Sequence, residues 1–177
     1  MHRMLHRFKR QLLIAGLLGT CFTSIGVEWT SEDGIVSFQL PDDASWGQVK
    51  LKTPGAKLML METNGAALVF FAAFEKERRH VNLNQEYIEI WKAVTYPKSK
   101  AKKLVSGEFF SFKGKRAYKA RDEDTKDGVK VRGGTILWMD DDRLFAIVAS
   151  KNEADPLEDE VIKAFVASTK FLPKTKK

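Results

Sequence analysis

The chain has 177 residues, of which 44% are hydrophobic and 11% are aromatic, and it contains 12 Gly, 5 Pro and one Cys. This aromatic content excludes a disordered chain, and the Gly and Pro content excludes a collagen-like or low-complexity chain. A single Cys cannot form a disulfide framework. The composition therefore predicts one soluble globular domain.

The formal net charge of +7 is concentrated at the N-terminus. Residues 1–26 carry four basic residues and no acidic one, so the rest of the chain has 26 Lys and Arg against 23 Asp and Glu, a net charge of +3. The basic character that would suggest nucleic-acid binding thus belongs mostly to the N-terminal segment. We predict no nucleic-acid partner.

The N-terminal segment has the pattern of a secretory signal peptide, in which a basic start precedes an apolar run that ends in small residues. The run at 12–27 has 16 residues, fewer than the roughly 20 that a bilayer-spanning helix needs. We predict a signal peptide over residues 1–26, cleaved after Gly26, and export to the periplasm or the extracellular space. Two alternatives remain open: lipidation of Cys21, which follows a lipobox-like Leu-Gly-Thr, and an uncleaved signal anchor.

The exported chain is poor in the residues of enzyme sites, since it retains at most one Cys and only one His, His80. A Ser-His-Asp or Cys-His arrangement would depend on His80 alone, and a zinc site normally needs two to four His or Cys ligands. His80 ends a charged run, which is typical of a surface position. There is no P-loop, GxGxxG, HExxH or GxSxG motif. We predict no enzyme activity, no cofactor and no metal.

In the first half of the chain, alternating apolar residues predict a strand at 35–40 with a hairpin partner before it. Further strands are expected at 57–62 and 67–74, joined by an Asn64-Gly65 turn. A helix follows, with Asn82 as its N-cap and Pro97 as its stop. Its apolar stripe at helical spacing comprises Leu83, Tyr87, Ile90, Trp91 and Val94.

In the second half, strands are expected at 103–112, 115–122, 129–139 and 143–150. Turns are expected at Lys113-Gly114, at 122–128 and at 140–142, and Gly133-Gly134 indicates a bulge or a close backbone approach. A last helix begins with Asp155 as N-cap and Pro156 as first residue. Its stripe comprises Leu157, Val161, Phe165 and Ser168, and residues 173–177 form a basic flexible tail.

Hairpin-linked strands with one helix between strand groups and one at the end predict the α+β class. The strands at 70–74 and 144–149 are apolar on both faces, so helices or long loops are expected on both sides of the sheet. The aromatic residues Trp91, Trp138 and Phe165 are accordingly expected in the core and not in a ligand site.

This order of elements resembles the PsbP-like superfamily, which groups the extrinsic PsbP subunit of photosystem II, a Ran-release factor and DcrB-type bacterial envelope proteins. The resemblance extends over residues 29–172 and is carried by VSFQLP at 36–41, Trp46, GKRAY at 114–118, RLFAIVA at 143–149 and ASTKF at 167–171. It implies a single domain over 27–172, built as an α/β/α sandwich with a central antiparallel sheet of about six strands and helices on both faces. It also implies accessory, binding or assembly roles, and no catalytic residues.

Three functions are considered. The first is an exported, non-enzymatic accessory protein of the cell envelope that binds a protein partner. The second is a protein that binds a membrane surface or an anionic ligand through its basic loops, with the candidate residues Lys76, Arg78, Arg79, Lys98, Lys100, Lys102 and Lys103. The third is a cation-dependent factor that uses the turn carboxylates Asp122, Glu123, Asp124, Asp140, Asp141 and Asp142.

Overall fold

The computed structural model of the chain describes residues 28–30, 36–40, 45–50, 57–62, 68–75, 83–140 and 143–172. The predicted signal peptide and C-terminal tail lie outside these residues. So do His80 and the candidate basic residues Lys76, Arg78 and Arg79. No helix among the described residues has the length and apolarity needed to cross a bilayer.

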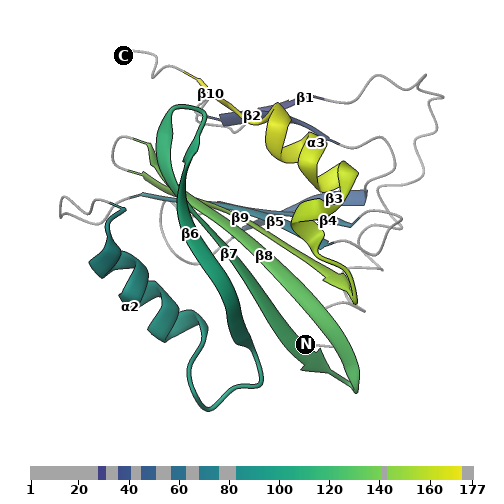
Figure 1. The fold of residues 1–177 in the computed structure, drawn as a ribbon. Coiled ribbons are helices and arrows are strands. Elements are labelled where there is room, and N and C mark those ends of the chain that lie inside the picture. The colour runs from purple at the N-terminus through teal and green to yellow at the C-terminus, as the bar shows by residue number, and fades with distance from the viewer. Residues whose placement is uncertain are drawn as a thin grey trace.

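The main sheet is antiparallel and has seven strands in the order β3-β4-β5-β9-β8-β7-β6, where about six were predicted (Figure 1). Its strands are β3 (Ser45–Lys50), β4 (Lys57–Glu62), β5 (Leu68–Glu75), β6 (Lys103–Phe112), β7 (Lys115–Lys126), β8 (Val129–Asp140) and β9 (Arg143–Asn152). The sequence did not predict β3, which contains Trp46. The predicted hairpin between β4 and β5 is confirmed by their pairing, while its Asn64-Gly65 turn lies outside the described residues.

A second sheet has three strands, β1 (Glu28–Thr30), β2 (Val36–Gln39) and β10 (Lys170–Phe171), in the order β1-β2-β10. β1 is the predicted hairpin partner of β2, and it places Trp29 opposite Phe38. Their rings stack with centroids 4.9 Å apart. β10 joins the two ends of the described chain, because it pairs with β2 through Lys170 and Ser37.

The turns between β6, β7 and β8 are tight. Lys113 and Gly114 both have positive φ values, 52° and 76°, as a two-residue turn of this type requires, and the prediction there is confirmed. The prediction of a polar turn over 122–128 is wrong, because β7 continues to Lys126 and only Asp127 and Gly128 turn the chain. These polar residues remain in the strand because their backbone pairs with β8 up to Lys126.

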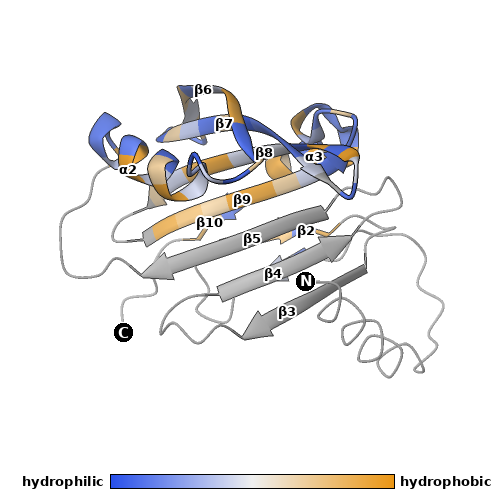
Figure 2. Cartoon of the chain, turned by 90° about the horizontal axis from the view of Figure 1, so that it is seen from below, coloured by the Kyte–Doolittle hydropathy of each residue, from blue (hydrophilic) through white to orange (hydrophobic). Residues whose placement is uncertain are grey.

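Two groups of buried side chains pack against β7, β8 and β9. The first group includes Trp138 of β8 and Phe145 and Ile147 of β9. The second group includes Leu137 of β8 and Ala146 of β9. Since alternate residues of a strand point to opposite faces, the two groups lie on opposite faces of the sheet. Trp138 and Phe165 are buried as predicted, while Trp91 packs half-buried against the second group. Figure 2 shows β9 as largely hydrophobic along its length.

Helix α2 (Gln85–Thr95) contributes Ile88 to the second group. Its N-cap is Asn84, whose Oδ1 accepts a hydrogen bond of 2.8 Å from the Tyr87 N–H, so the prediction of Asn82 was wrong. The predicted apolar stripe is also partly wrong, because Ile90 and Val94 are 59% and 74% exposed. The helix carries apolar residues on more than one side, and packing against the sheet selects the side of Ile88.

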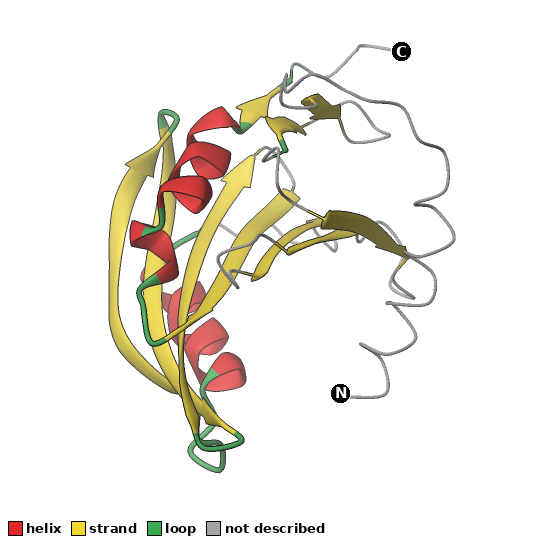
Figure 3. Ribbon diagram, turned by 90° about the vertical axis from the view of Figure 1, so that its right-hand side faces the viewer, coloured by secondary structure: helices red, strands yellow, loops and turns green. Residues whose placement is uncertain are grey.

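The last predicted helix consists of two pieces, the 3₁₀ helix η1 (Pro156–Glu158) and α3 (Glu160–Ser168), which Figure 3 shows in sequence along the sheet. Asp155 caps η1 as predicted, and Asp159 caps α3. In α3 the buried residues are Ile162 and Phe165, in the first group; Val161 is only half-buried. The buried face of α3 therefore starts at Ile162, one residue after the predicted Val161, because α3 begins as a new helix after η1.

Candidate binding surface

The basic segment, which we define as residues 97–103, connects α2 to β6. Lys98, Lys100 and Lys103 are exposed, whereas Lys102 is half-buried. The Lys100 N–H donates a hydrogen bond of 3.0 Å to the Pro97 carbonyl, which closes a turn. The turn carries the exposed Lys98 and Lys100 on a connection that contains no acidic residue.

Both ends of this turn are bound to one buried carboxylate, that of Asp122 in β7. The Tyr96 hydroxyl donates a hydrogen bond of 3.0 Å to Asp122 Oδ2, and Lys102 Nζ lies 3.1 Å from the same oxygen. The Asp122 side chain is only 3% exposed. The structure thus brings together Lys102 and Asp122, which the sequence assigned to two different hypotheses, and gives both a structural role.

Aromatic rings complete this cluster. Lys102 Nζ lies 5.4 Å from the centroid of the Tyr96 ring, a cation–π distance, and Trp91 packs edge-on against Tyr96 with centroids 5.5 Å apart. Burial raises the pKa of Tyr96 far above its ordinary value, and the negative charge of Asp122 raises it further. Tyr96 therefore stays protonated and remains a hydrogen-bond donor to Asp122.

Gly133 and Gly134 provide the close approach that the sequence indicated. Gly133 pairs with Asp122 in the sheet, and a Cβ at position 133 would overlap with the Asp122 carboxylate. A Cβ at position 134 would overlap with Leu157 of η1. The pairing with both neighbouring strands shows no register shift at these two residues, so they do not form a bulge.

Of the acidic residues in the third hypothesis, the three that the structure describes in β7 do not lie on a turn. Asp122, Glu123 and Asp124 lie in β7, where successive side chains point to opposite faces. Asp122 binds Lys102, and Glu123 lies 3.0 Å from Lys130 Nζ and 3.5 Å from Arg132 Nε. Within the described ranges, no three His, Cys, Asp or Glu residues are placed to hold a metal ion. Asp140 is the last residue of β8, and Asp141 and Asp142 lie outside those ranges.

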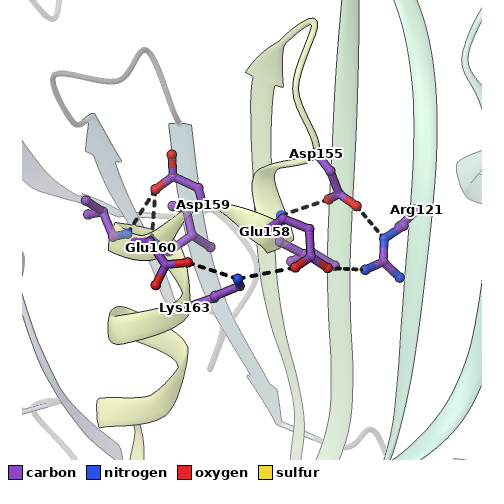
Figure 4. A network of polar contacts seen from close by, with 9 residues as sticks. Arg121, Asp155, Glu158, Asp159, Glu160 and Lys163 are labelled. Atoms are coloured by element: carbon purple, nitrogen blue, oxygen red, sulfur yellow. Dashed lines mark hydrogen bonds and ion pairs between the residues drawn. The ribbon is translucent and has the colours of Figure 1, made fainter.

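A second polar network holds η1 and α3 against β7 (Figure 4). Arg121 binds Asp155 through Nε and Glu158 through Nη2, the latter at 2.8 Å. Lys163 lies 3.3 Å from Glu158 and 3.0 Å from Glu160. Because its acids and bases are paired with one another, this network is a structural link between strand and helix.

Exposed aliphatic residues occur on the two elements that the basic segment connects. Ile90 and Val94 are exposed on α2, and Val105, 60% exposed, lies on β6. Sequence periodicity placed the first two in the core, and no local signal could have corrected this. Tyr96 was also missed, since its partners are distant in sequence. The signal for the buried Asp122 side chain was Gly133, a glycine inside the strand that lies opposite it.

The architecture described here, an antiparallel sheet with helices packed on it, is of the α+β class. No protein-family model and no curated protein sequence matches the chain. Among solved structures it is similar to cyanobacterial PsbP (CyanoP) from Synechocystis sp. PCC 6803, with a TM-score of 0.62 and 15% identity over 88% of this chain and 99% of that one.

Two further structures are similar. One, from Bacteroides thetaiotaomicron, has a TM-score of 0.55 and 11% identity, and covers 86% of this chain and 50% of its own. The other, a mutant of protein Mog1, has a TM-score of 0.54 and 7% identity, and the match covers 84% of this chain and 97% of the Mog1 chain. At these identities the comparison shows the fold alone. The chain has the PsbP-like fold, as the sequence resemblance predicted.

Proposed function

We propose that this protein is an exported, non-enzymatic accessory protein of the cell envelope, a PsbP-like α/β/α sandwich that binds a protein partner through the basic segment. The observation that carries the proposal is the attachment of Tyr96 and Lys102 to Asp122. A surface loop fixed in one geometry loses little entropy on binding. Fixing a turn that carries Lys98 and Lys100 therefore favours recognition of a complementary, acidic surface.

Charge distribution supports an acidic partner. The chain from residue 27 onward has a net charge of only +3, yet four of the seven residues at 97–103 are lysines. Lys102 is engaged with Asp122, which leaves Lys98, Lys100 and Lys103 to interact with a partner. Such charges raise association rates and are screened by salt, so we expect binding to weaken as ionic strength rises.

A photo-crosslinking residue at Ser99, which is exposed within the turn, tests this proposal in intact envelopes. We expect one predominant adduct, identified by mass spectrometry, that is lost when Lys98, Lys100 and Lys103 are all replaced by Glu. The matched control replaces the same three lysines by Arg, which keeps their charge and should keep the adduct. An adduct that survives the first triple substitution, or the absence of any adduct, contradicts the proposal.

Export is a separate part of the proposal and rests on the basic and apolar pattern of residues 1–26. N-terminal sequencing of the purified protein is expected to begin at Val27. A sequence beginning at Met1 would contradict cleavage, and a diacyl group on Cys21 would establish the lipoprotein alternative.

The second function, binding to an anionic membrane surface, is favoured by the exposed Ile90 and Val94 beside the lysines, since apolar and basic residues together bind lipid interfaces. Sedimentation with vesicles of phosphatidylcholine, with and without phosphatidylglycerol, tests it. Binding that requires phosphatidylglycerol and is lost in Ile90→Ser/Val94→Ser supports this function. Equal sedimentation with both vesicle types excludes it.

A further inference from the structure

β6 forms one end of the seven-stranded sheet, and no described strand pairs with its outer edge. Such an edge presents unpaired backbone N–H and C=O groups, which natural proteins normally protect with Lys, Pro, a bulge or a very short strand. β6 has 10 residues and one register shift, between Leu104 and Ser106. Past this shift, residues 106–112 pair regularly with β7 and contain neither Lys nor Pro. We call residues 106–112 the open edge.

The turn after β6 determines which backbone groups of the open edge face outward. A two-residue turn is closed by a hydrogen-bonded pair, which here is Phe112 with Lys115. From this pair onward, bonded and non-bonded pairs alternate along an antiparallel ladder. The N–H and C=O groups that point away from β7 therefore belong to residues 107, 109 and 111.

The side chains of the open edge leave room for another strand. Ser106, Gly107 and Ser111 are small and exposed. Phe109 is half-buried, and its ring packs edge-on against Tyr118 of β7, with centroids 5.2 Å apart. This packing fixes β6 on the sheet, so the strand loses little entropy when another strand pairs with it.

The half of the β6–β7 hairpin that contains the open edge is basic. Residues 106–121 include five Lys and Arg and one acidic residue, Glu108. Glu108 Oε1 lies 2.9 Å from Lys119 Nζ, so its charge is already paired. Arg116 is exposed, and its guanidinium carbon lies 4.2 Å from the centroid of the Phe109 ring, which places a positive charge at the edge itself. The charge of this hairpin is complementary to that of an acidic strand.

We propose that an extended, acidic segment of another protein pairs with the open edge and adds a strand to the sheet. In strand addition of this kind, main-chain hydrogen bonds supply affinity and alternate side chains supply specificity. A second copy of this chain fits less well, because two copies paired through residues 106–112 would bring two basic hairpins together. The proposal goes beyond the proposed function and does not depend on it, since it uses none of residues 97–103.

Amide hydrogen exchange measured by NMR tests the proposal on the purified full-length product, as processed by the exporting cell. The probe is a synthetic peptide of alternating Glu and Val, about eight residues long. In the free protein, the outward amides at 107, 109 and 111 should exchange much faster than that of Phe110, whose N–H faces β7. The probe should slow exchange at all three positions by about tenfold or more. No slowing at about 1 mM probe overturns the proposal.

Two control peptides separate strand pairing from charge alone. Replacing every Glu of the probe by Lys reverses its charge, and methylating every backbone nitrogen keeps the charge but removes all N–H donors. Neither peptide should slow exchange at the open edge. Equal slowing by the Lys peptide would contradict charge complementarity, and equal slowing by the methylated peptide would contradict strand addition.

Two matched pairs of variants test the edge itself, with binding of a dye-labelled probe followed by fluorescence anisotropy. Ser111→Pro removes an outward N–H, at a position of an edge strand where Pro is tolerated, whereas Ser111→Ala keeps it. The Pro variant should weaken binding about tenfold or more and the Ala variant should not. Arg116→Glu should weaken binding several-fold, and Arg116→Lys should retain it. Circular dichroism melting establishes that each variant is folded, and the Arg116 pair decides the test alone where Ser111→Pro is not.

Binding that is unchanged in Arg116→Glu overturns the proposal. So does slow exchange at 107, 109 and 111 that develops with protein concentration in the absence of the probe, because it would assign the open edge to a second copy. None of these variants alters the basic segment or Ser99, and loss of the Ser99 adduct would leave the exchange result intact. The two proposals can therefore fail separately.

Discussion

Gly133 lies directly opposite Asp122 in the pairing of β7 with β8, and the Asp122 carboxylate fills the space that a Cβ at position 133 would occupy. A buried carboxylate is costly unless it is paired and hydrogen-bonded. Here the missing side chain of Gly133 makes room for it, and Lys102 and Tyr96 satisfy it. The fixed position of the basic segment therefore depends on a glycine in a neighbouring strand.

Gly133→Ala is expected to destabilise the protein by about 1–3 kcal/mol, the usual cost of overpacking a buried site. Urea denaturation measures the free energy of unfolding. In an Asp122→Ala background the methyl group has space, so the same substitution should cost much less. Equal costs in the two backgrounds would show that the carboxylate and Gly133 do not compete for space.

Removal of the Tyr96 hydroxyl tests the attachment of the turn. Tyr96→Phe keeps the ring and its contact with Trp91, and should cost about 1 kcal/mol for one hydrogen bond. Amide hydrogen exchange at 98–101 should accelerate, because one end of the turn is released. Thr125→Val, at an exposed position of β7 whose side chain has no described hydrogen bond, is the control and should leave exchange at 98–101 unchanged.

The pKa of Asp159 predicts a dependence of stability on pH. A hydrogen bond from Lys151 holds this pKa below its ordinary value of 3.8, assisted by the N–H groups of Ile162 and Val161. Its charged form therefore stabilises the folded state above about pH 4, and this contribution is lost as the pH falls through the lowered pKa.

Asp159→Asn keeps a capping side chain but removes the charge, so its free energy of unfolding should fall less steeply between about pH 5 and pH 2 than that of the unmodified protein. Lys151→Met should act in the same direction, because it removes the main cause of the lowered pKa. Identical pH profiles for all three proteins would contradict the assignment.

Phe165 packs α3 against the second sheet and belongs to the first buried group. It is 1% exposed and packs edge-on against Phe38 of β2, with centroids 4.6 Å apart. Phe165→Ala should cost about 3–5 kcal/mol, whereas Val161→Ala, at a half-buried position, should cost less than about 1.5 kcal/mol. A cost below about 1 kcal/mol for Phe165→Ala would mean that α3 is peripheral.

Local patterns in the sequence determined the consecutive hairpins. Strand alternation and the Lys113-Gly114 turn located β6 to β9 within a few residues, because neighbouring strands pair through short connections and each turn depends on its own residues. The α+β class and the PsbP-like fold followed from this order of elements. Gly133 could be recognised as a close approach because a glycine inside a strand needs such a reason.

Tertiary packing decided the rest. α2 has apolar residues on more than one side, and the energy of covering the sheet selected Ile88 and left Ile90 and Val94 exposed. Likewise, Tyr96 and Lys102 contact Asp122 only because β6 pairs with β7. This pairing brings together residues that are at least 20 positions apart in the chain. Burial and ion pairing depend on neighbours that are distant in the chain, so the basic segment was visible in the sequence but the carboxylate that fixes it was not.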